Sequence, residues 1–201
     1  MNRTALALIL AASLALPATT AGANIIVFSG NFSGTQEFPP NASPGTGLVS
    51  VTIDDVLNIM TVDAAWANLL APTTVAHIHC CTGLGANAGV ATGVPTFPGV
   101  PAGVTSGTYN ATFDMTLASS WNPAFVTAQG GTTASAFTAL INAMSASNAY
   151  FNIHSQQFPG GEIRAQLSPV PEPSTWAMLL LGFAAVGLTI RRARRRVAAI
   201  A

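Results

Sequence analysis

Alternating apolar and polar residues dominate the chain between about residues 25 and 167. In the segment 46–53, Val49, Val51 and Ile53 share one side, which is the period of a strand with one buried face. A polar turn leads into 57–66, where the same period returns, so the two segments predict a β-hairpin. Further strands are predicted at 25–28, 73–79, 103–117, 149–154 and 161–167.

One segment has a helical period instead. Within 133–145 the apolar residues recur at i, i+3, i+4 and i+7, with Thr132 or Thr133 as the N-cap, and a shorter helix is predicted near 122–129. Many short strands with one or two short helices predict a mainly β fold, an antiparallel β-sandwich of immunoglobulin-like or related topology. The apolar helical positions are Phe137, Leu140, Ile141 and Met144.

The N-terminus has the pattern of a signal peptide. Arg3 gives a positive start, 5–16 is apolar, and Ala21 and Ala23 form a small-x-small cleavage site. We therefore expect signal peptidase to remove residues 1–23. The predicted folded body is 24–168.

The C-terminal segment 169–201 has three parts. It begins with Pro171, Glu172 and Pro173, continues as an uncharged apolar run that predicts a transmembrane helix over 174–190, and ends in five arginines. The run is slightly shorter than the span of about 20 residues that crosses a bilayer comfortably, and the positive-inside rule places the arginines in the cytoplasm. A buried core helix with a solvated basic patch is the alternative. The arginines are Arg191, Arg192, Arg194, Arg195 and Arg196.

Together these three parts resemble the PEP-CTERM sorting signal of exported bacterial proteins. The resemblance implies processing by an exosortase, a membrane-embedded cysteine transpeptidase, after signal peptidase has acted. It also implies a precursor held transiently in the inner membrane, with its body on the periplasmic side. The destination would be the cell surface or the extracellular matrix.

The charge of the body differs from the formal net charge of zero of the whole chain. Six of the seven basic residues lie in the two end segments, so 24–168 carries six negative charges against one positive, a net charge of −5, and the chain has no lysine. This composition argues against nucleic acid as a partner, because phosphate binding depends on clustered Lys and Arg. A surface of hydroxyls and amides is compatible with exopolysaccharide or other matrix components.

Four motifs of the body occur in a characteristic order. They are Gln36-Glu37-Phe38-Pro39-Pro40, Ala76-His77-Ile78-His79, Tyr150-Phe151-Asn152-Ile153-His154 and Phe158-Pro159-Gly160-Gly161-Glu162-Ile163-Arg164. Together they resemble the CHRD domain, over about residues 28–167. The resemblance implies an extracellular binding domain and supplies no catalytic activity. We find no recognised catalytic motif either, so we expect no enzyme.

The three histidines of the chain are the candidate metal ligands. His77 and His79 share one face of a strand, and His154 lies on another strand. Three imidazoles suit copper or zinc, with Cys80 or Glu162 as the expected extra protein ligand. A His-x-His strand also resembles copper/zinc superoxide dismutase and makes that topology an alternative, although dismutase sites need more histidines than this chain has.

The same residues also allow a purely structural interpretation. The imidazoles could hydrogen-bond to backbone carbonyls and to Asn152, and Glu162 could pair with Arg164 to hold the last hairpin. The function is then that of a non-enzymatic surface or matrix module, and a small copper- or zinc-binding metalloprotein is the alternative.

Two adjacent cysteines, Cys80 and Cys81, remain. Because neighbouring strand residues point to opposite faces, we expect no disulfide between them. They would be small buried hydrophobes, with a strained vicinal disulfide, an intermolecular disulfide and a thiolate ligand beside His79 as the alternatives.

Overall fold

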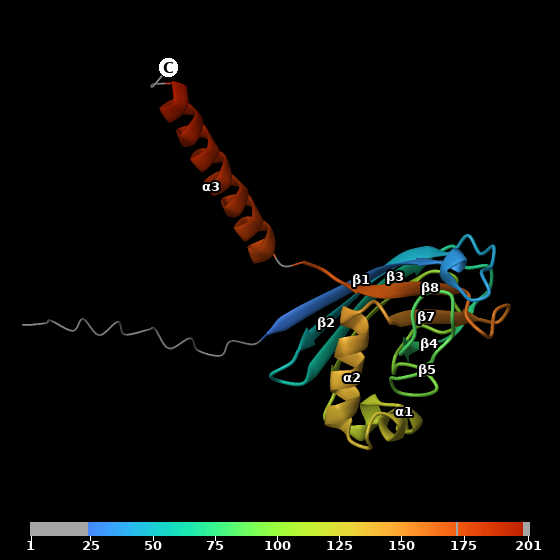
Figure 1. Ribbon diagram of the computed structural model, residues 1–201. Helices are drawn as coiled ribbons and strands as arrows, with labels where there is room; N and C mark the ends of the chain where they lie inside the picture. Colours follow the sequence, from blue (N-terminus) through green and yellow to red (C-terminus); the bar gives the residue numbers. More distant parts are fainter. Residues whose placement is uncertain (1–23, 172, 199–201) are drawn as a thin grey trace, which may run out of the picture.

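The computed structural model describes residues 24–171 and 173–198. Its strands form one antiparallel sheet in the order β5-β4-β7-β8-β1-β2-β3-β6, which curls around a core (Figure 1). The strands are β1 (Ile25–Ser33), β2 (Thr46–Asp54), β3 (Ile59–Ala67), β4 (Thr73–Cys80), β5 (Gly89–Val90), β6 (Gly107–Asp114), β7 (Ala149–Ser155) and β8 (Ile163–Pro169). The helices are η1 (Gly34–Gln36), η2 (Ala118–Ser120), α1 (Pro123–Ala128), α2 (Thr133–Ser145) and α3 (Pro173–Ala198).

The mainly β fold is confirmed, but a sandwich of two separate sheets is wrong. β1 joins the two halves, because it pairs along its whole length with β2 and pairs with β8 at Phe28, Ser29 and Ser33. Gly30 of β1 lies against β8: a Cβ there would be 2.4 Å from the carbonyl oxygen of Gln166. The absence of a side chain at this position permits the close approach of the two strands.

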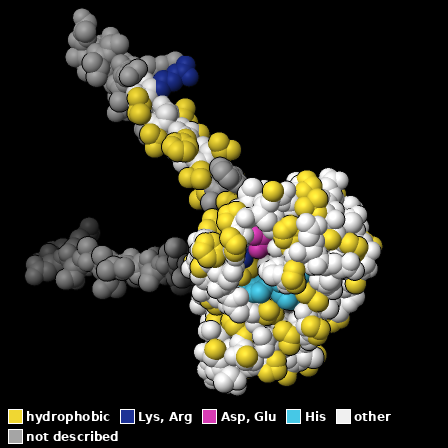
Figure 2. Space-filling view, turned by 90° about the vertical axis from the view of Figure 1, so that its right-hand side faces the viewer, with side chains coloured by type: hydrophobic (Ala, Val, Ile, Leu, Met, Phe, Trp, Pro, Cys, Tyr) yellow, Lys and Arg dark blue, Asp and Glu magenta, His cyan; other side chains and the backbone are white. Residues whose placement is uncertain are grey.

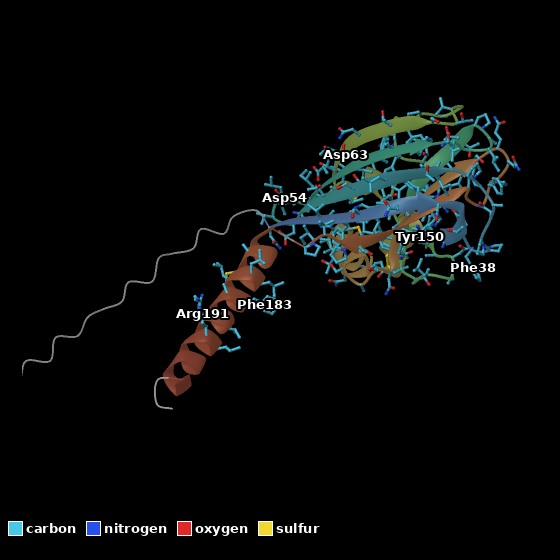
Figure 3. The ribbon with its side chains drawn as sticks, turned by 90° about the horizontal axis from the view of Figure 1, so that it is seen from above. Phe38, Asp54, Asp63, Tyr150, Phe183 and Arg191 are labelled. Atoms are coloured by element: carbon cyan, nitrogen blue, oxygen red, sulfur yellow. A yellow bond between two sulfur atoms is a disulfide. The ribbon has the colours of Figure 1, made fainter. Side chains whose placement is uncertain are left out.

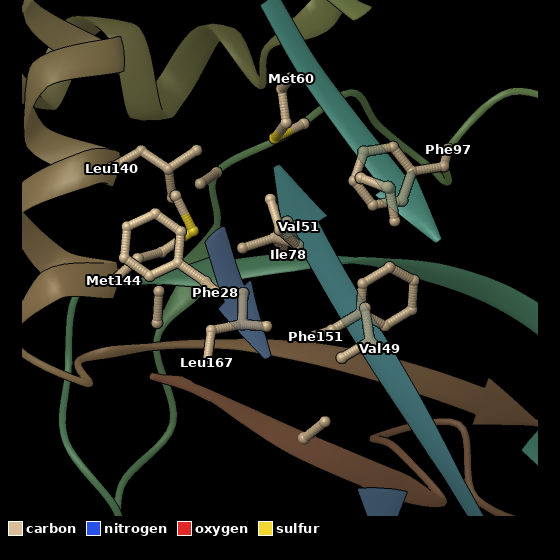
Figure 4. Packing of buried hydrophobic residues seen from close by; sticks show 14 of the residues in the cluster. Phe28, Val49, Val51, Met60, Ile78, Phe97, Leu140, Met144, Phe151 and Leu167 are labelled. Atoms are coloured by element: carbon tan, nitrogen blue, oxygen red, sulfur yellow. The ribbon is translucent and has the colours of Figure 1, made fainter. Parts of the chain in front are cut away.

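The inner face of the curled sheet forms the core. Val49, Val51 and Ile53 of β2 are fully buried, which confirms the face predicted from their alternation. The helix α2 closes the core from the side, and Leu140 and Met144 point from it toward the strands (Figure 4). Replacing Leu140 by Ala would cost about 2–5 kcal/mol of unfolding free energy, as is usual for a buried leucine.

Both predicted helices of the body are present. α2 has the predicted bounds, and Thr132 is its N-cap: the Thr132 hydroxyl accepts the backbone N–H of Ser135 at 3.1 Å. α1 begins after Asn122, whose side chain caps Ala124 N–H at 3.0 Å. The predicted strand at 103–117 is shorter than expected, because only Gly107–Asp114 pairs with β3.

The C-terminal residues 173–198 form α3, and Figure 3 labels Phe183 and Arg191 on it. Among the described residues, no helix combines the length and the apolar character needed to cross a membrane. The transmembrane helix predicted at 174–190 is therefore not supported. Of the sorting motif, Glu172 lies outside the described residues, as do Ala21 and Ala23 of the predicted cleavage site.

Candidate metal centre

Three histidines meet on the outer face of the sheet, opposite the hydrophobic core. β4 supplies His77 and His79, and the neighbouring strand β7 supplies His154. One ring nitrogen from each of the three lies within 4.8 Å of the other two. Their exposed fractions are only 6%, 9% and 7%, and Figure 2 shows histidine atoms in a hollow of the body. Strand alternation puts His77 and His79 on one face, and the pairing of β4 with β7 brings His154 to them.

The segment 81–106, which includes β5, covers the histidines and hydrogen-bonds along the edge of β4 opposite β7. Thr92 Oγ1 accepts the backbone N–H of Ile78 at 3.1 Å, and the N–H of Ala91 donates to the Ile78 carbonyl at 2.8 Å. Further along, the N–H of Phe97 donates to the Ala76 carbonyl at 2.9 Å. These contacts satisfy the polar backbone of β4 beyond its short pairing with β5 and hold the segment 81–106 over the site.

Each imidazole is oriented by a backbone carbonyl. The Nδ1 atoms lie 3.0 Å from the carbonyl oxygen of Pro95 for His77, 2.8 Å from that of Ala88 for His79, and 2.9 Å from that of Pro159 for His154. A carbonyl oxygen can only accept, so each Nδ1 is the protonated, donating nitrogen. In the neutral rings each Nε2 therefore keeps a free lone pair, as metal-binding histidines do.

The Nε2 atoms converge without a donor between them. His77 Nε2 and His154 Nε2 are 3.0 Å apart, and His79 Nε2 is buried with no hydrogen-bond partner. Two lone pairs at this distance repel each other unless a cation or a proton lies between them. A tetrahedral zinc ion with bonds of about 2.0–2.1 Å separates its nitrogen ligands by about 3.3 Å, and the 3.0 Å between His77 and His154 is close to this value. The ring nitrogens of the whole group lie within 4.8 Å of one another, so binding a single ion would draw the three rings closer together.

Burial keeps the imidazoles neutral. Desolvation lowers the pKa of His77 to about 4, with a further contribution from His154. Desolvation likewise lowers the pKa of His79 to about 3, assisted by His77, and it also lowers the pKa of His154. Near neutral pH all three rings are therefore in the deprotonated form that binds metal ions.

A buried ion pair lies beside the histidines. Arg164 of β8 donates to Glu37 Oε2 at 3.1 Å, and both side chains are almost fully buried. The prediction that Arg164 pairs with Glu162 is thus wrong, because Glu162 accepts from Ser43 Oγ at 2.7 Å and from the N–H of Leu70 at 2.6 Å. Burial raises the pKa of Glu37 to about 7, against the opposing effect of Arg164.

The two predicted extra ligands are not part of the cluster. Glu162 lies outside the group of converging ring nitrogens, and the sulfur of Cys80 is bonded to that of Cys81. The expectation of no mutual disulfide is wrong because β4 ends at Cys80, so strand alternation does not extend to Cys81. The backbone carbonyls of the structural interpretation are confirmed as the partners of all three Nδ1 atoms, whereas Asn152 Oδ1 has no hydrogen-bond partner.

The fold and the site together define a curled antiparallel β domain with a covered three-histidine cluster. The CHRD domain family matches residues 28–167, and the chain belongs to this family. A PEP-CTERM protein-sorting motif matches residues 169–196, so the chain is an exported protein that is processed by an exosortase. Comparison with curated proteins found no match. Comparison with solved structures found none either.

Proposed function

We propose that this chain is a non-enzymatic module of the cell surface or extracellular matrix that binds one copper or zinc ion through Nε2 of His77, His79 and His154. The observation that carries the proposal is the 3.0 Å separation of His77 Nε2 and His154 Nε2, with both Nδ1 atoms committed to carbonyls. Imidazole is a good ligand for both metals, and the general order of affinities favours copper(II) over zinc.

Three ligands leave one position of a tetrahedral ion for water or a small ligand. Among the described residues, no carboxylate or thiolate joins the three ring nitrogens. The chain's own contribution is to orient the three lone pairs and to limit access by solvent. The bound ion would supply positive charge and, for copper, one-electron redox chemistry.

The experiment is metal analysis of the purified protein after loading with copper(II) or zinc and removal of excess metal. We expect one ion per chain, and none in His77→Gln or His154→Gln, which keep much of the side-chain volume. Thr112→Val, on the exposed outer face of β6, is the matched control and should bind one ion. A wild-type protein that retains no stoichiometric metal at neutral pH would refute the proposal.

The sorting motif supports a route for this module. The precursor would be associated with the inner membrane through its C-terminal sorting segment, with its body in the periplasm, until exosortase processing delivers it to the surface. Deletion of 176–196 should remove the precursor from the membrane fraction. An unchanged fractionation pattern would count against this anchor.

A further inference from the structure

Arg164 is the only basic residue of the predicted body, yet its side chain is 1% exposed and lies beside the histidine cluster. We propose that Arg164 is a positioning residue for the metal centre. Through Tyr150 and the residues 86–88, it holds the ring of His79 with Nε2 facing His77 and His154. This inference rests on the proposed function, because it assigns a role within the same site.

The first connection is a stack of side chains. The guanidinium carbon of Arg164 lies 3.8 Å from the centre of the Tyr150 ring. The Tyr150 ring in turn stacks on His79, with ring centres 4.8 Å apart and planes inclined by only 10°. Aromatic and cation–π contacts of this kind fix ring planes as well as positions. The plane of the His79 ring is therefore set by Tyr150, which packs against Arg164.

The second connection runs through the covering loop. Arg164 donates from Nη1 to the Ala86 carbonyl at 3.0 Å and from Nη2 to Asn87 Oδ1 at 2.5 Å. The next residue, Ala88, accepts His79 Nδ1–H at 2.8 Å, and its N–H donates to the Tyr150 hydroxyl at 3.1 Å. The carbonyl that orients His79 thus belongs to a segment that Arg164 anchors.

The arrangement depends on the shape of arginine. Its planar guanidinium donates in several fixed directions at once, here to Ala86, Asn87 and Glu37, while its face stays on Tyr150. A lysine would keep the positive charge against Glu37 but could not hold the loop and the ring together. Arg164 touches no Nε2 atom, so its effect on a bound ion passes through His79.

His77 and His154 are oriented independently of Arg164. Their Nδ1 atoms bond to Pro95 and Pro159, which lie outside the segment 86–88. Loss of Arg164 should therefore free the His79 ring and leave the other two rings in place. The centre would keep two fixed ligands, and we expect its metal affinity to fall about 10–100-fold, the usual effect of losing an orienting outer partner.

The test compares Arg164→Lys with wild type and with the control Thr112→Val. One measurement is the dissociation constant for copper(II) by competition titration, and a second is the electron paramagnetic resonance spectrum of the copper(II) form. The third uses the metal-free protein: ¹⁵N NMR of labelled histidines, in which a hydrogen-bonded Nδ1–H gives a protected signal. For Arg164→Lys we expect weaker binding, an altered copper spectrum and loss of the His79 signal alone.

If Arg164→Lys does not fold, Tyr150→Phe tests the same connection. This variant keeps the aromatic stack but removes the hydroxyl that accepts from Ala88, so a smaller weakening of the same kind is expected. An unchanged copper affinity and spectrum, or an unchanged His79 signal, would overturn the positioning role. A wild-type protein that binds no metal would overturn the proposed function, and the NMR of the metal-free protein would still decide whether Arg164 orients His79.

Discussion

The two halves of the sheet have very different outer faces, although both are built from alternating strands. On β2, β3 and β6 the outer row Thr52, Thr61 and Thr112 lies in register, and Thr61 and Thr112 share a hydrogen bond of 3.0 Å at the surface. On β4, β7 and β8 the corresponding positions carry histidines, Tyr150 and Arg164, and they are buried. Figure 3 labels Asp63 on the first half and Tyr150 on the second.

The difference lies in what covers each half. The loop at 81–106 hydrogen-bonds along β4, while Phe38, just after η1, lies near the same face, where its carbonyl accepts from Asn87 Nδ2 at 2.8 Å. Covered polar groups lose water and must find partners, so they form a connected network with shifted pKa values. Side chains of the other half are solvated, and their interactions contribute little to stability. The segment 81–106 and Phe38 bury the outer face of β4, β7 and β8. This burial, more than the strand sequence, makes that face the candidate site.

The largest expected effect comes from breaking the buried ion pair. Glu37→Leu leaves Arg164 buried, charged and unable to deprotonate, so we expect the free energy of unfolding to fall by about 3–5 kcal/mol. The double variant Glu37→Leu/Arg164→Met removes both charges and should recover much of this loss. Urea denaturation measures both variants.

The matched change on the exposed half is Asp63→Asn, which loses one surface carboxylate beside Asn110. It should change the free energy of unfolding by less than about 1 kcal/mol. Equal losses for Glu37→Leu and Asp63→Asn would show that covering does not distinguish the two faces.

The second prediction concerns metal loading. An ion that binds only the folded chain stabilises it by about 2.7–4.1 kcal/mol when the free metal is 100 to 1,000 times the dissociation constant. Thermal unfolding with and without copper(II) should show this gain for wild type and for Asp63→Asn. His154→Gln should gain nothing, and a similar gain for that variant would place the metal elsewhere.

A third, smaller effect is the pH dependence of the metal-free protein. The lowered pKa values of His77, near 4, and His79, near 3, mean that the unfolded chain binds more protons below about pH 6.5. Stability from these groups is present above pH 6.5 and is lost as the pH falls toward 4. Glu37 acts oppositely: its stability is present below pH 4.5 and is lost as the pH rises through about 7.

Because three histidines oppose one glutamate, the urea midpoint should fall as the pH decreases from 6.5 to 4. Glu37→Gln removes the opposing group and should make this fall steeper, whereas His79→Gln should make it shallower. A urea midpoint that rises on acidification would contradict the sign of the histidine contribution.

Local patterns predicted much of this structure. The period of Val49, Val51 and Ile53 identified a buried strand face, and the spacing from Phe137 to Met144 located α2, because both patterns depend on neighbouring residues alone. Alternation also placed His77 and His79 together. The approach of β8 to β1 depends on which strands pair across the chain, which no local period records, so the continuous curled sheet was missed.

The network around Arg164 was missed for a related reason. Glu37 lies far from Arg164 in the chain, and only the pairing of β1 with β8 places Ser33, shortly before Glu37, opposite Arg164. One signal was available: a lone arginine in an acidic, lysine-free body occurs at a strand position and needs a partner. Strand alternation alone favoured the nearby Glu162 as the partner of Arg164. The fold instead places Glu37 beside Arg164.

The smallest expected effects on stability test the segment 81–106 itself. The same substitution, threonine to valine, is made once in that segment and once on the exposed outer face. Thr92 is fully buried, and its hydroxyl accepts the N–H of Ile78 between the two β4 histidines. Thr92→Val leaves that N–H without a partner and should cost about 1–3 kcal/mol of unfolding free energy. Thr61→Val, on the exposed face, should change it by less than about 0.5 kcal/mol, because solvent can replace the lost hydrogen bond.

Amide hydrogen exchange separates the two outcomes residue by residue. Thr92→Val should increase exchange at Ile78 and Ala91, which join β4 to the loop, while Thr61→Val should leave exchange there unchanged. If both variants lose the same stability and Ile78 stays protected in each, the loop would not be what separates the two halves. Greater exchange at Ile78 in Thr92→Val alone would show that one side-chain hydrogen bond holds the cover against the strand that carries His77 and His79.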